Sequence, residues 1–309
     1  VVREMGKDMV YLPVYYKRGG LLPAAEPFRL RNDGTMEKLS GNEGTEEVAV
    51  RMVTGAPAYD QNREYLGCMK GSRIASALAY GEALWWNRKK LQRWVDTFVC
   101  PSSFMAQKMR ACGYDYTKLS VICNFIEQDK LDFFHSTEIN EGEKSRYYCY
   151  VGRLSEEKGV RMLLEVAESL PFPLYIAGDG PLLNELQAKY SSGNVIFLGH
   201  LSSMEIVRLV KHAQTMVVPS IWYENNPLSV IESLCMGTPV IGAEVGGIPE
   251  LIREGDGMLF RMGDKEELAS AIVSVMSKDN VDTQGIARRA QKRFSEERYW
   301  AELKSVYDL

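Results

Sequence analysis

The sequence is poor in the residues that build metal sites and disulfide frameworks. It contains three histidines and six cysteines among its 309 residues, and no two cysteines have C-x-x-C spacing. These counts argue against a zinc or copper centre, so no metal ligands are predicted. The cysteines lie mostly in apolar stretches, which predicts buried free thiols in a reducing, cytoplasmic compartment.

Long apolar runs and an excess of basic charge are also missing. No run reaches the ~20 apolar residues that a membrane span needs, and the first ten residues, VVREMGKDMV, lack the apolar core of a signal peptide. A formal net charge of −4 gives no support to nucleic-acid binding. The composition, 45% apolar and 25% charged, is that of a globular protein, and 309 residues predict two domains.

Strand and helix patterns alternate from about residue 95 onward. A strand is predicted at 95–100, a helix at 101–113 and a strand at 118–126, followed by a polar linker at 135–146. Apolar strands and amphipathic helices then alternate over about residues 145–290. Strands are expected at 147–152, 173–178, 194–199, 215–220 and 238–243, and helices at 158–170, 182–190, 203–213, 228–236, 248–254 and 266–277. This alternation predicts a parallel sheet covered on both faces, a Rossmann-like domain.

The first 94 residues are less regular. A strand is expected within 10–16, residues 17–60 show no period, and 72–94 reads as one long helix. This helix and its vicinity combine tryptophans with a cationic cluster against the single acid Glu82: Trp85, Trp86, Trp94, Lys70, Arg73, Arg88, Lys89, Lys90 and Arg93. That composition fits contact with an anionic lipid surface, and it also fits a helix with a buried aromatic side and a solvated charged face.

The segment ENNPLSVIE, residues 224–232, places Glu224 and Glu232 eight positions apart around a helix start. Asn226 and Pro227 are typical of an N-cap and a first helical position. Free N–H groups of a first turn favour an anion, and carboxylates accept hydrogen bonds from hydroxyls. The segment therefore suits a ligand that is both polyhydroxylated and negatively charged, unless the two acids are simply solvated.

The loop VGRLSEEKG, residues 151–159, also joins a predicted strand to a helix. Gly152 permits a tight turn, and Arg153 and Lys158 flank the helix entrance as a clamp for a pyrophosphate would. The alternative is a surface ion network of these cations with Glu156 and Glu157.

Three further strand ends are compatible with a ligand. Gly178 and Gly180 in AGDGP permit close approach of a ligand, or form a simple turn. Gly199 and His200 follow the next strand, where a planar base could lie against the backbone, although a histidine there also fits simple packing. The paired glycines of EVGGIPELI, residues 244–252, follow the last predicted strand. Ligands of parallel sheets bind at these carboxyl ends.

The order and spacing of these segments resemble the C-terminal domain of retaining GT-B glycosyltransferases, family four of the sequence-based classification, also called glycosyl transferases group 1. The matching segments are GRLSEEKG, AGDGP, FLGHLS, ENNPLSVIE, GTPVIGAEVGGIPELI and GDGMLF, with VDTFVCPSSFMAQKM and VICNFIE before them, over about residues 68–309. The resemblance implies an α/β, GT-B fold of two Rossmann-like domains facing a cleft. The acceptor-side domain would span 1–134 and the nucleotide-sugar-binding domain 145–294, with a helix at about 295–309 packing back on the first.

The resemblance also implies the roles of the residues. Arg153 and Lys158 would bind the diphosphate, Glu232 the ribose hydroxyls, and Glu224 with the backbone of Asn225, Asn226, Pro227 and Leu228 the transferred sugar. Gly152, Gly178, Gly199 and His200 would line the donor site, with Gly199 facing the base. Arg153, Lys158 and Glu224 are the expected catalytic set. They would assist departure of a UDP or GDP leaving group with retention and without a metal or cofactor.

The N-terminal part departs from the family pattern. The usual first strand with a glycine-rich loop is not evident, and the only histidine before His200 is His135, in the predicted linker. We therefore expect the N-terminal domain to be incomplete or remodelled.

The implied function is sugar transfer to a glycan or lipid-linked acceptor, in surface polysaccharide, lipopolysaccharide or glycolipid synthesis, in the cytoplasm or at the inner face of the membrane. The alternatives are a catalytically silent partner subunit that binds a nucleotide sugar, and a GT-B epimerase. The segment from Glu224 to Glu232, called the E-x7-E segment below, disfavours the epimerase.

Overall fold

The computed structural model describes residues 9–11, 28–30, 36–38, 92–137, 145–190, 193–278 and 280–307. The chain divides into two compact units. One holds Val1–Val99 and Ala106–Ser120, and the other holds Cys100–Met105 and Val121–Leu309. In the first unit, the strands β1 (Met9–Tyr11), β2 (Phe28–Leu30) and β3 (Met36–Lys38) pair antiparallel in that order. The predicted helix 72–94 lies outside the described residues, apart from its last three.

A two-stranded sheet lies around the predicted helix 101–113. The strands β4 (Phe98–Cys100) and β5 (Leu119–Val121) form a two-stranded sheet, and between them run α4 (Ser103–Ala111) and a 3-10 turn at Tyr116–Lys118. Gly113 follows α4 with a φ of 81°, a left-handed conformation typical of glycine after a helix. The predicted strand, helix and strand are therefore present, each shorter than expected.

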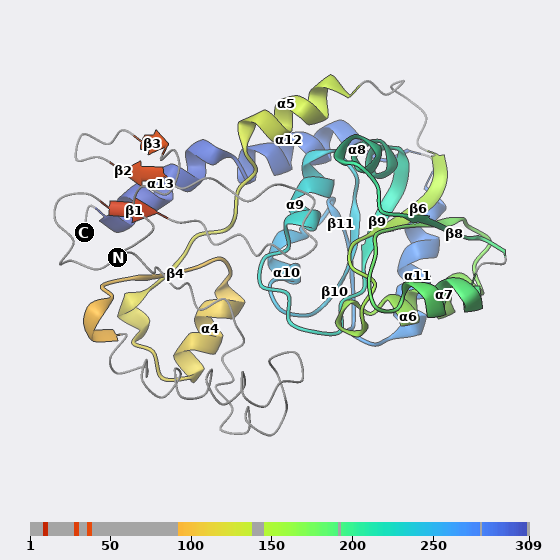
Figure 1. Ribbon diagram of the computed structural model, residues 1–309, viewed down its shortest axis with the longest axis horizontal. Helices are drawn as coiled ribbons and strands as arrows, with labels where there is room; N and C mark the ends of the chain where they lie inside the picture. The colour runs from red at the N-terminus through yellow and green to blue at the C-terminus, as the bar shows by residue number, and fades with distance from the viewer. Residues whose placement is uncertain are drawn as a thin grey trace. The chain divides into compact units, whose positions relative to one another are not determined.

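The second unit is built on a six-stranded sheet with strand order β11-β10-β9-β6-β7-β8 (Figure 1). Each neighbouring pair is parallel. The strands are β6 (Ser145–Val151), β7 (Leu174–Ala177), β8 (Val195–Gly199), β9 (Ala213–Val218), β10 (Val240–Ala243) and β11 (Gly257–Phe260). Counted along the chain, the order from β8 is 3-2-1-4-5-6, which defines a doubly wound Rossmann sheet. The predicted α/β fold class is confirmed.

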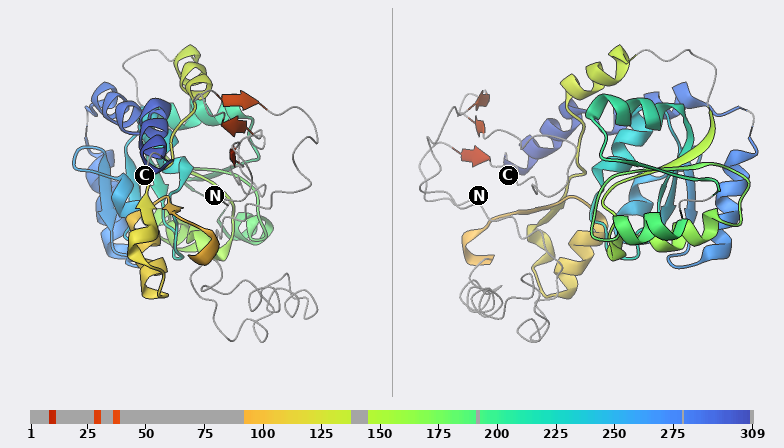
Figure 2. Two further views of the ribbon diagram at one scale, coloured as in Figure 1. Left: turned by 90° about the vertical axis from the view of Figure 1, so that its left-hand side faces the viewer. Right: turned by 45° about the vertical axis from the view of Figure 1, so that its right-hand side comes forward.

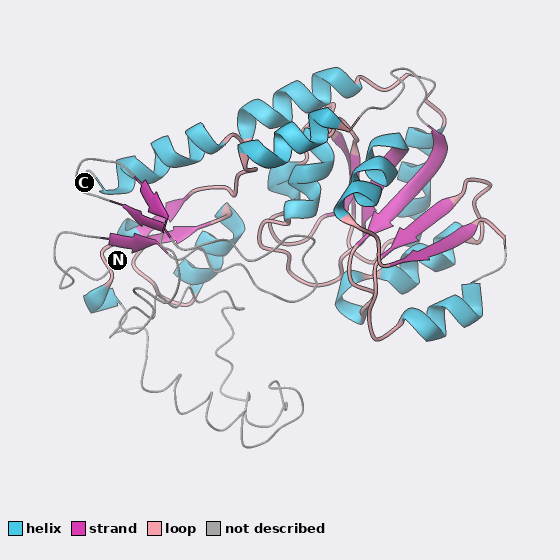
Figure 3. Ribbon diagram, turned by 45° about the horizontal axis from the view of Figure 1, so that its top comes forward, coloured by secondary structure: helices cyan, strands magenta, loops and turns pink. Residues whose placement is uncertain are grey.

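Helices cover both faces of this sheet. In the right-hand view of Figure 2 the green helices α6 and α7 lie on one side of the strands and the teal α8 on the other, and Figure 3 shows the magenta strands between cyan helices. The helix α11 packs on α6, while α9 packs on α10 and α12. These helices are α6 (Val160–Ala167), α7 (Leu183–Tyr190), α8 (Ser203–His212), α9 (Leu228–Cys235), α10 (Ile248–Leu251), α11 (Lys265–Met276) and α12 (Thr283–Arg293).

The burial of the central strands explains their apolar sequences. Every residue of β10 is buried, and so is β9 as far as Val217. A strand that is covered on both faces reads as an unbroken apolar run because neither side meets water. The helix α8 begins with a capping box in which Ser202 and Glu205 satisfy each other's backbone N–H groups. The sequence therefore predicted five of the six strands, all but β11, and the helices α6 to α11.

Two helices of this unit were not predicted. The helix α5 (Gln128–Ser136) lies partly in the segment read as a linker, and α12 (Thr283–Arg293) lies in a stretch to which no element was assigned. Both are largely polar, and each buries only two residues: Leu131 and Phe134 in α5, Ile286 and Ala290 in α12. The last helix, α13 (Glu296–Tyr307), agrees with the helix expected at the end of the chain. It groups with the second unit, and the predicted domain boundaries stay a prediction.

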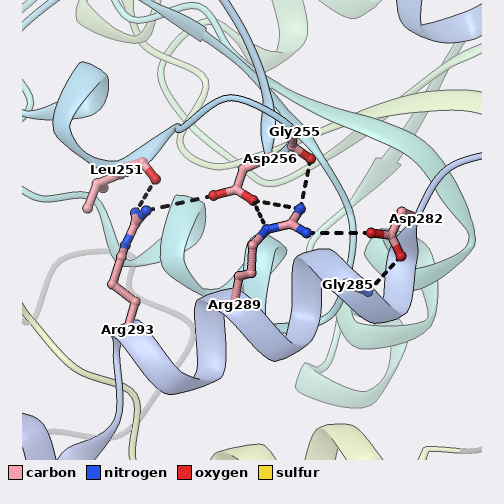
Figure 4. Close-up of polar contacts among 7 residues, drawn as sticks. All are labelled: Leu251, Gly255, Asp256, Asp282, Gly285, Arg289 and Arg293. Carbon is pink, nitrogen blue, oxygen red and sulfur yellow. Dashed lines mark hydrogen bonds and ion pairs between the residues drawn. The ribbon is translucent and has the colours of Figure 1, made fainter.

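A buried carboxylate connects α12 to the turn before β11 (Figure 4). Asp256, 2% exposed, accepts from Arg289 Nε at 3.1 Å and lies 3.7 Å from an Arg293 nitrogen. Arg289 also donates to the Gly255 carbonyl at 3.1 Å and meets Asp282 at 3.5 Å. This network fixes α12 against the turn before β11.

One buried hydroxyl lacks a partner. Tyr148 in β6 is 0% exposed, and its hydroxyl oxygen finds no hydrogen-bond partner in the described part of the chain. An unpaired buried hydroxyl carries its desolvation cost without compensation. We therefore expect Tyr148→Phe to raise the free energy of unfolding by about 1 kcal/mol, a rise in Tm of about 2–4 °C. Thermal denaturation measures the change in Tm, and a lower Tm for Tyr148→Phe would show that the hydroxyl has a partner.

No helix among the described residues is long and apolar enough to cross a membrane.

Candidate functional site

The strand order of the sheet reverses between β6 and β9. Ligands of doubly wound sheets bind outside the carboxyl ends of the two strands at this switch point. The loop after β6 carries Arg153 and Lys158, and the loop after β9 carries Glu224. The three residues predicted to be catalytic therefore come from the two loops where a ligand is expected.

These two loops pack directly against each other. The N–H of Ile221 donates to the Glu157 carbonyl at 3.1 Å. Gly159 has a φ of 66°, and a Cβ added there would stand 1.9 Å from the Pro219 carbonyl oxygen. Only glycine fits such a contact. The glycine at the end of GRLSEEKG thus brings the two loops together.

Lys158 and Glu224 form an ion pair across the loops. Lys158 Nζ lies 2.6 Å from Glu224 Oε1, and the Ser220 hydroxyl donates to the same oxygen at 2.7 Å. The side chains of Lys158 and Glu224 are 34% and 17% exposed. No described residue donates to Glu224 Oε2, so this oxygen can accept from a ligand hydroxyl. An ammonium has three donors, so Lys158 keeps two after this contact.

Arg153 is exposed, and its guanidinium makes no hydrogen bond or ion pair with a described residue. The surface network considered as an alternative takes another form: Glu156 bonds to Arg161 at 2.9 Å, and Glu157 accepts from the Ser155 hydroxyl at 2.6 Å. The loop backbone is nevertheless fixed, because the Tyr150 hydroxyl donates to the Arg153 carbonyl at 2.7 Å.

The hydroxyl of Tyr150 stays protonated at this position. Burial, followed by the charges of Glu224 and Glu157, raises its pKa well above the usual range. Tyr150 is therefore a donor that supports the loop and not an acid or base near neutral pH.

The segment from Glu224 to Leu228 is held through its backbone and amides. Gly247 N–H donates to the Glu224 carbonyl at 2.6 Å, and the Ser102 hydroxyl donates to Asn225 Oδ1 at 2.8 Å. Cβ atoms on Gly246 and Gly247 would stand 2.0 and 1.9 Å from the carbonyl oxygens of Glu224 and Asn225. The paired glycines therefore serve loop packing at this site.

The prediction of Asn226 as the N-cap of α9 is wrong. Pro227 is the N-cap, and no side chain caps the helix. Asn226, 8% exposed, instead donates through Nδ2 to Cys123 Sγ at 3.3 Å, and its carbonyl accepts from Asn124 at 3.1 Å. Local preference was overridden by partners far away in sequence. The first turn of α9, beginning at Leu228, is thus free of a side-chain cap.

Glu232 lies on the second turn of α9 and forms an ion pair with Lys130 of α5. Their side chains are 14% and 13% exposed. Burial raises the pKa of Glu232, and Lys130 opposes that rise. The structure therefore pairs each acid of the E-x7-E segment with one lysine.

The loops after β7 and β8 contribute mainly backbone groups to the candidate site. Gly178 N–H donates to the Gly199 carbonyl at 2.8 Å, and a Cβ on Gly178 would stand 1.9 Å from the Gly152 carbonyl oxygen. Gly199 has a φ of 68°, with no atom within 4 Å of an added Cβ. His200 is exposed and bonds to no described side chain. The space beside Gly199 is open, as the predicted base position requires.

Several residues at the site were not predicted. They are Ser102, Cys123, Asn124, Lys130 and Ser220, with the exposed rings of Trp222 and Tyr223. Most contact a partner about 100 residues away, which no local pattern signals. Trp222 and Tyr223 are 60% and 49% exposed immediately before Glu224, and their run IWYE was the available signal. Among the described residues, no three His, Cys, Asp or Glu gather as a metal site would require.

The family of the chain follows from comparison with known proteins. The model of the family "Glycosyl transferases group 1" matches residues 133–295, just over half of the chain. The chain belongs to this family. The match covers both switch-point loops and both acids of the E-x7-E segment.

Related group 1 sequences carry transferase names. Over 229 residues the chain is 26% identical to the sulfoquinovosyl transferase SQD2 of Arabidopsis thaliana, covering 70% of this chain and 44% of the relative. It is 28% identical over 184 residues to an Escherichia coli UDP-Gal:alpha-D-GlcNAc-diphosphoundecaprenol alpha-1,3-galactosyltransferase, covering 52% and 46%. The chain spans about half the length of such relatives.

Solved structures of glycosyltransferases share the fold. The apo form of the lipopolysaccharide outer core galactosyltransferase WaaB aligns with a TM-score of 0.58 at 23% identity, covering 69% of this chain and 61% of WaaB. Anabaena Alr3699/HepE in complex with UDP-glucose aligns with a TM-score of 0.58 at 19% identity, covering 71% and 65%. The predicted GT-B fold class is therefore confirmed.

Proposed function

We propose that this chain transfers a sugar, with retention, from a UDP- or GDP-linked donor to a glycan or lipid-linked acceptor in surface polysaccharide, lipopolysaccharide or glycolipid synthesis. The observation that carries the proposal is the Lys158–Glu224 pair at the switch point of a Rossmann sheet. It places a cation for phosphate and a carboxylate for hydroxyls in adjacent loops of a group 1 glycosyltransferase.

The donor would be held in three parts. Arg153 and Lys158 would contact the diphosphate, assisted by the N–H groups at the uncapped start of α9. Glu224 and the backbone from Asn225 to Leu228 would hold the transferred sugar. Glu232 would accept from the ribose hydroxyls, while Gly152, Gly178, Gly199 and His200 line the base end.

Sugar transfer would use electrostatic stabilisation by these residues. Negative charge grows on the leaving diphosphate as the anomeric bond breaks, and a fixed cation stabilises that charge most in the transition state. Lys158 is positioned for this by Glu224 before the donor arrives. Both carboxylates of the segment are assigned to binding.

The exposed rings of Trp222 and Tyr223 support a saccharide ligand. Tyr223 is also packed against Phe104, with ring centroids 5.0 Å apart. Exposed aromatic side chains on a fixed loop indicate a binding surface. The aliphatic face of a sugar ring suits such a surface, and Glu224 next to it suits the hydroxyls.

A thermal-shift panel of nucleotide sugars tests the donor assignment. The full chain is heated with UDP, GDP, ADP and dTDP and with their hexose conjugates, in EDTA. A ligand present at 100 times its Kd adds about 2.7 kcal/mol to stability. We expect a UDP or GDP compound to raise Tm and the others to fail. No shift with any compound would contradict the proposal.

Release of free sugar separates the enzyme from a silent binding subunit. Incubation with the donor that binds should liberate sugar slowly without acceptor, and nuclear magnetic resonance of the first product formed should show the anomer of the donor. A donor that binds but is never cleaved, with or without membrane extract, would favour the partner-subunit alternative.

The acceptor side of the proposal rests on sequence alone. The cationic, tryptophan-containing helix predicted at 72–94 is proposed to contact anionic lipid at the inner face of the membrane. Sedimentation with anionic and neutral vesicles tests this lipid contact, and absence of binding to anionic vesicles at low salt would contradict it. The domain division 1–134 and 145–294, with 295–309 packing back, is likewise proposed.

A further inference from the structure

Lys130 and Glu232 form a contact between two helices that are distant in sequence. Lys130 Nζ donates to Glu232 Oε1, and both side chains are largely buried at 13% and 14% exposure. Lys130 is carried by α5, which buries Leu131 and Phe134, and its ammonium lies 5.9 Å from the Phe134 ring centroid. The lysine is therefore held in place and is not a mobile surface cation.

The pair uses only one oxygen of the carboxylate. Lys130 is the one described residue that donates to Glu232, and it contacts Oε1. Oε2 receives no hydrogen bond from a described residue. It is not fully buried either, because among the described side chains Tyr148 Oη is the one polar atom that is both fully buried and unpaired. Oε2 therefore stays open to a donor from outside.

The charge of Lys130 dominates the surroundings of this carboxylate. Burial raises the pKa of Glu232, and Lys130 is the charged group that counteracts it within the described residues. On α9 itself, burial and then the charge of Glu232 raise the pKa of Cys235 to about 12. On α12, which packs on α9, the charge of Arg293 counteracts the rise in the pKa of Cys235. Without Lys130, Glu232 would have no counterion in the described part of the chain.

We propose that Lys130 is a positioning residue, which keeps Glu232 ionised and orients its Oε2 toward a ribose hydroxyl of the donor nucleotide. The proposal rests on the proposed donor site. An ionised carboxylate is an acceptor at both oxygens, whereas a protonated one must also place its own proton. Fixing one oxygen with an ammonium leaves the other with a defined direction, which a site that distinguishes ribose from deoxyribose requires.

The test compares ribonucleotides with deoxyribonucleotides. Calorimetric titration measures the Kd of UDP, GDP and their 2′-deoxy and 3′-deoxy forms for the full chain and its variants. For the wild type, we expect the better ribonucleotide to bind about ten times more tightly than a deoxy form, or about 1.4 kcal/mol. In Lys130→Met this ratio should fall toward one, and Lys130→Arg should restore most of it.

The pH dependence separates positioning from packing. Removing the cation raises the pKa of Glu232 further, so the buried carboxyl takes up its proton at a higher pH. Binding of the ribonucleotide to Lys130→Met should therefore weaken between pH 8 and pH 6 by more than that of the wild type. The deoxy form that lacks the contacted hydroxyl should show no such difference.

Lys211 provides a matched control. Its ammonium donates to the carbonyls of Phe134 and Thr137, at 2.5 and 3.2 Å, and so supports the same helix without touching Glu232. Lys211→Met should lower Tm but leave the ratio of ribose to deoxyribose affinity unchanged.

Three results would overturn the proposal. They are an unchanged ratio in Lys130→Met, equal weakening of ribo and deoxy forms, and loss of the ratio in Lys211→Met. If Lys130→Met does not fold, Lys130→Gln keeps a donor without the charge and is judged by the same ratio and pH profile. A wild type that binds no nucleotide refutes the proposed function itself, and that result is seen before any variant is made.

Discussion

Replacing Lys158 with alanine is expected to lower the maximal rate of sugar release or transfer about 100- to 1,000-fold, or about 2.7–4 kcal/mol. Donor affinity should fall far less. The ammonium lies 2.6 Å from Glu224 Oε1 and retains two donors for the diphosphate. Because charge on the leaving group grows along the reaction, its loss is felt most in the transition state. Single-turnover rates and equilibrium donor binding measure the two effects separately.

The control for this variant is a lysine of the same unit that is also ion-paired. Lys265 Nζ lies 2.7 Å from Glu165, and both side chains are well exposed, at 59% and 40%. Exposed pairs of this kind contribute little, so Lys265→Ala should leave both rate and affinity unchanged. If Lys158→Ala loses donor affinity but keeps the maximal rate of the wild type, Lys158 only binds the donor.

Arg153→Ala should also lower the maximal rate more than the donor affinity. Its guanidinium has no hydrogen-bonded partner among the described residues, so its donors need not leave an internal contact to reach a phosphate. Lys158 by contrast is held by Glu224, and Glu224→Gln would weaken that hold. The geometry thus gives the two cations different tasks, one free to follow the ligand and one fixed in advance.

The sequence predicted those parts of the site that depend on local patterns. Apolar runs identified five of the six strands of the sheet, and the loops after them contained Arg153, Lys158 and Glu224 as the parallel sheet requires. The strand order could not be read from the sequence, because it depends on which strands pair. It emerges only from the structure, where β6 and β9 lie side by side.

Long-range contacts explain what was missed or misread. Lys130 meets Glu232 and Asn226 meets Cys123 across more than 100 residues, so no spacing rule connects them. Gly178 was predicted to admit a ligand or to form a simple turn, and its missing Cβ makes room for the Gly152 carbonyl. The helix α12 was missed because its sequence is mostly polar and has Gly285 in its first turn. It is fixed instead by the contacts of Asp256.

Asp256→Ala is expected to destabilise the chain by about 3 kcal/mol or more, the usual cost of removing one partner from a buried ion pair. The carboxylate side chain is 3% exposed and that of Arg293 is 11% exposed. Without Asp256, Arg293 keeps the Leu251 carbonyl as a partner, but its buried charge loses the carboxylate (Figure 4). Thermal denaturation should show Tm lowered by about 6 °C or more.

Asp282 is the matched control for Asp256, because both carboxylates contact Arg289. Asp282 is 71% exposed, lies 3.5 Å from Arg289 and caps α12 through the Gly285 N–H at 2.9 Å. Asp282→Ala should therefore cost only the value of a helix cap, about 1 kcal/mol. If the two variants lower Tm equally, burial of the charge is not what makes Asp256 important. A buried arginine that loses its counterion should lower the free energy of unfolding. If Asp256→Ala is as stable as the wild type, the Arg289–Asp256–Arg293 network does not hold α12 to the turn before β11.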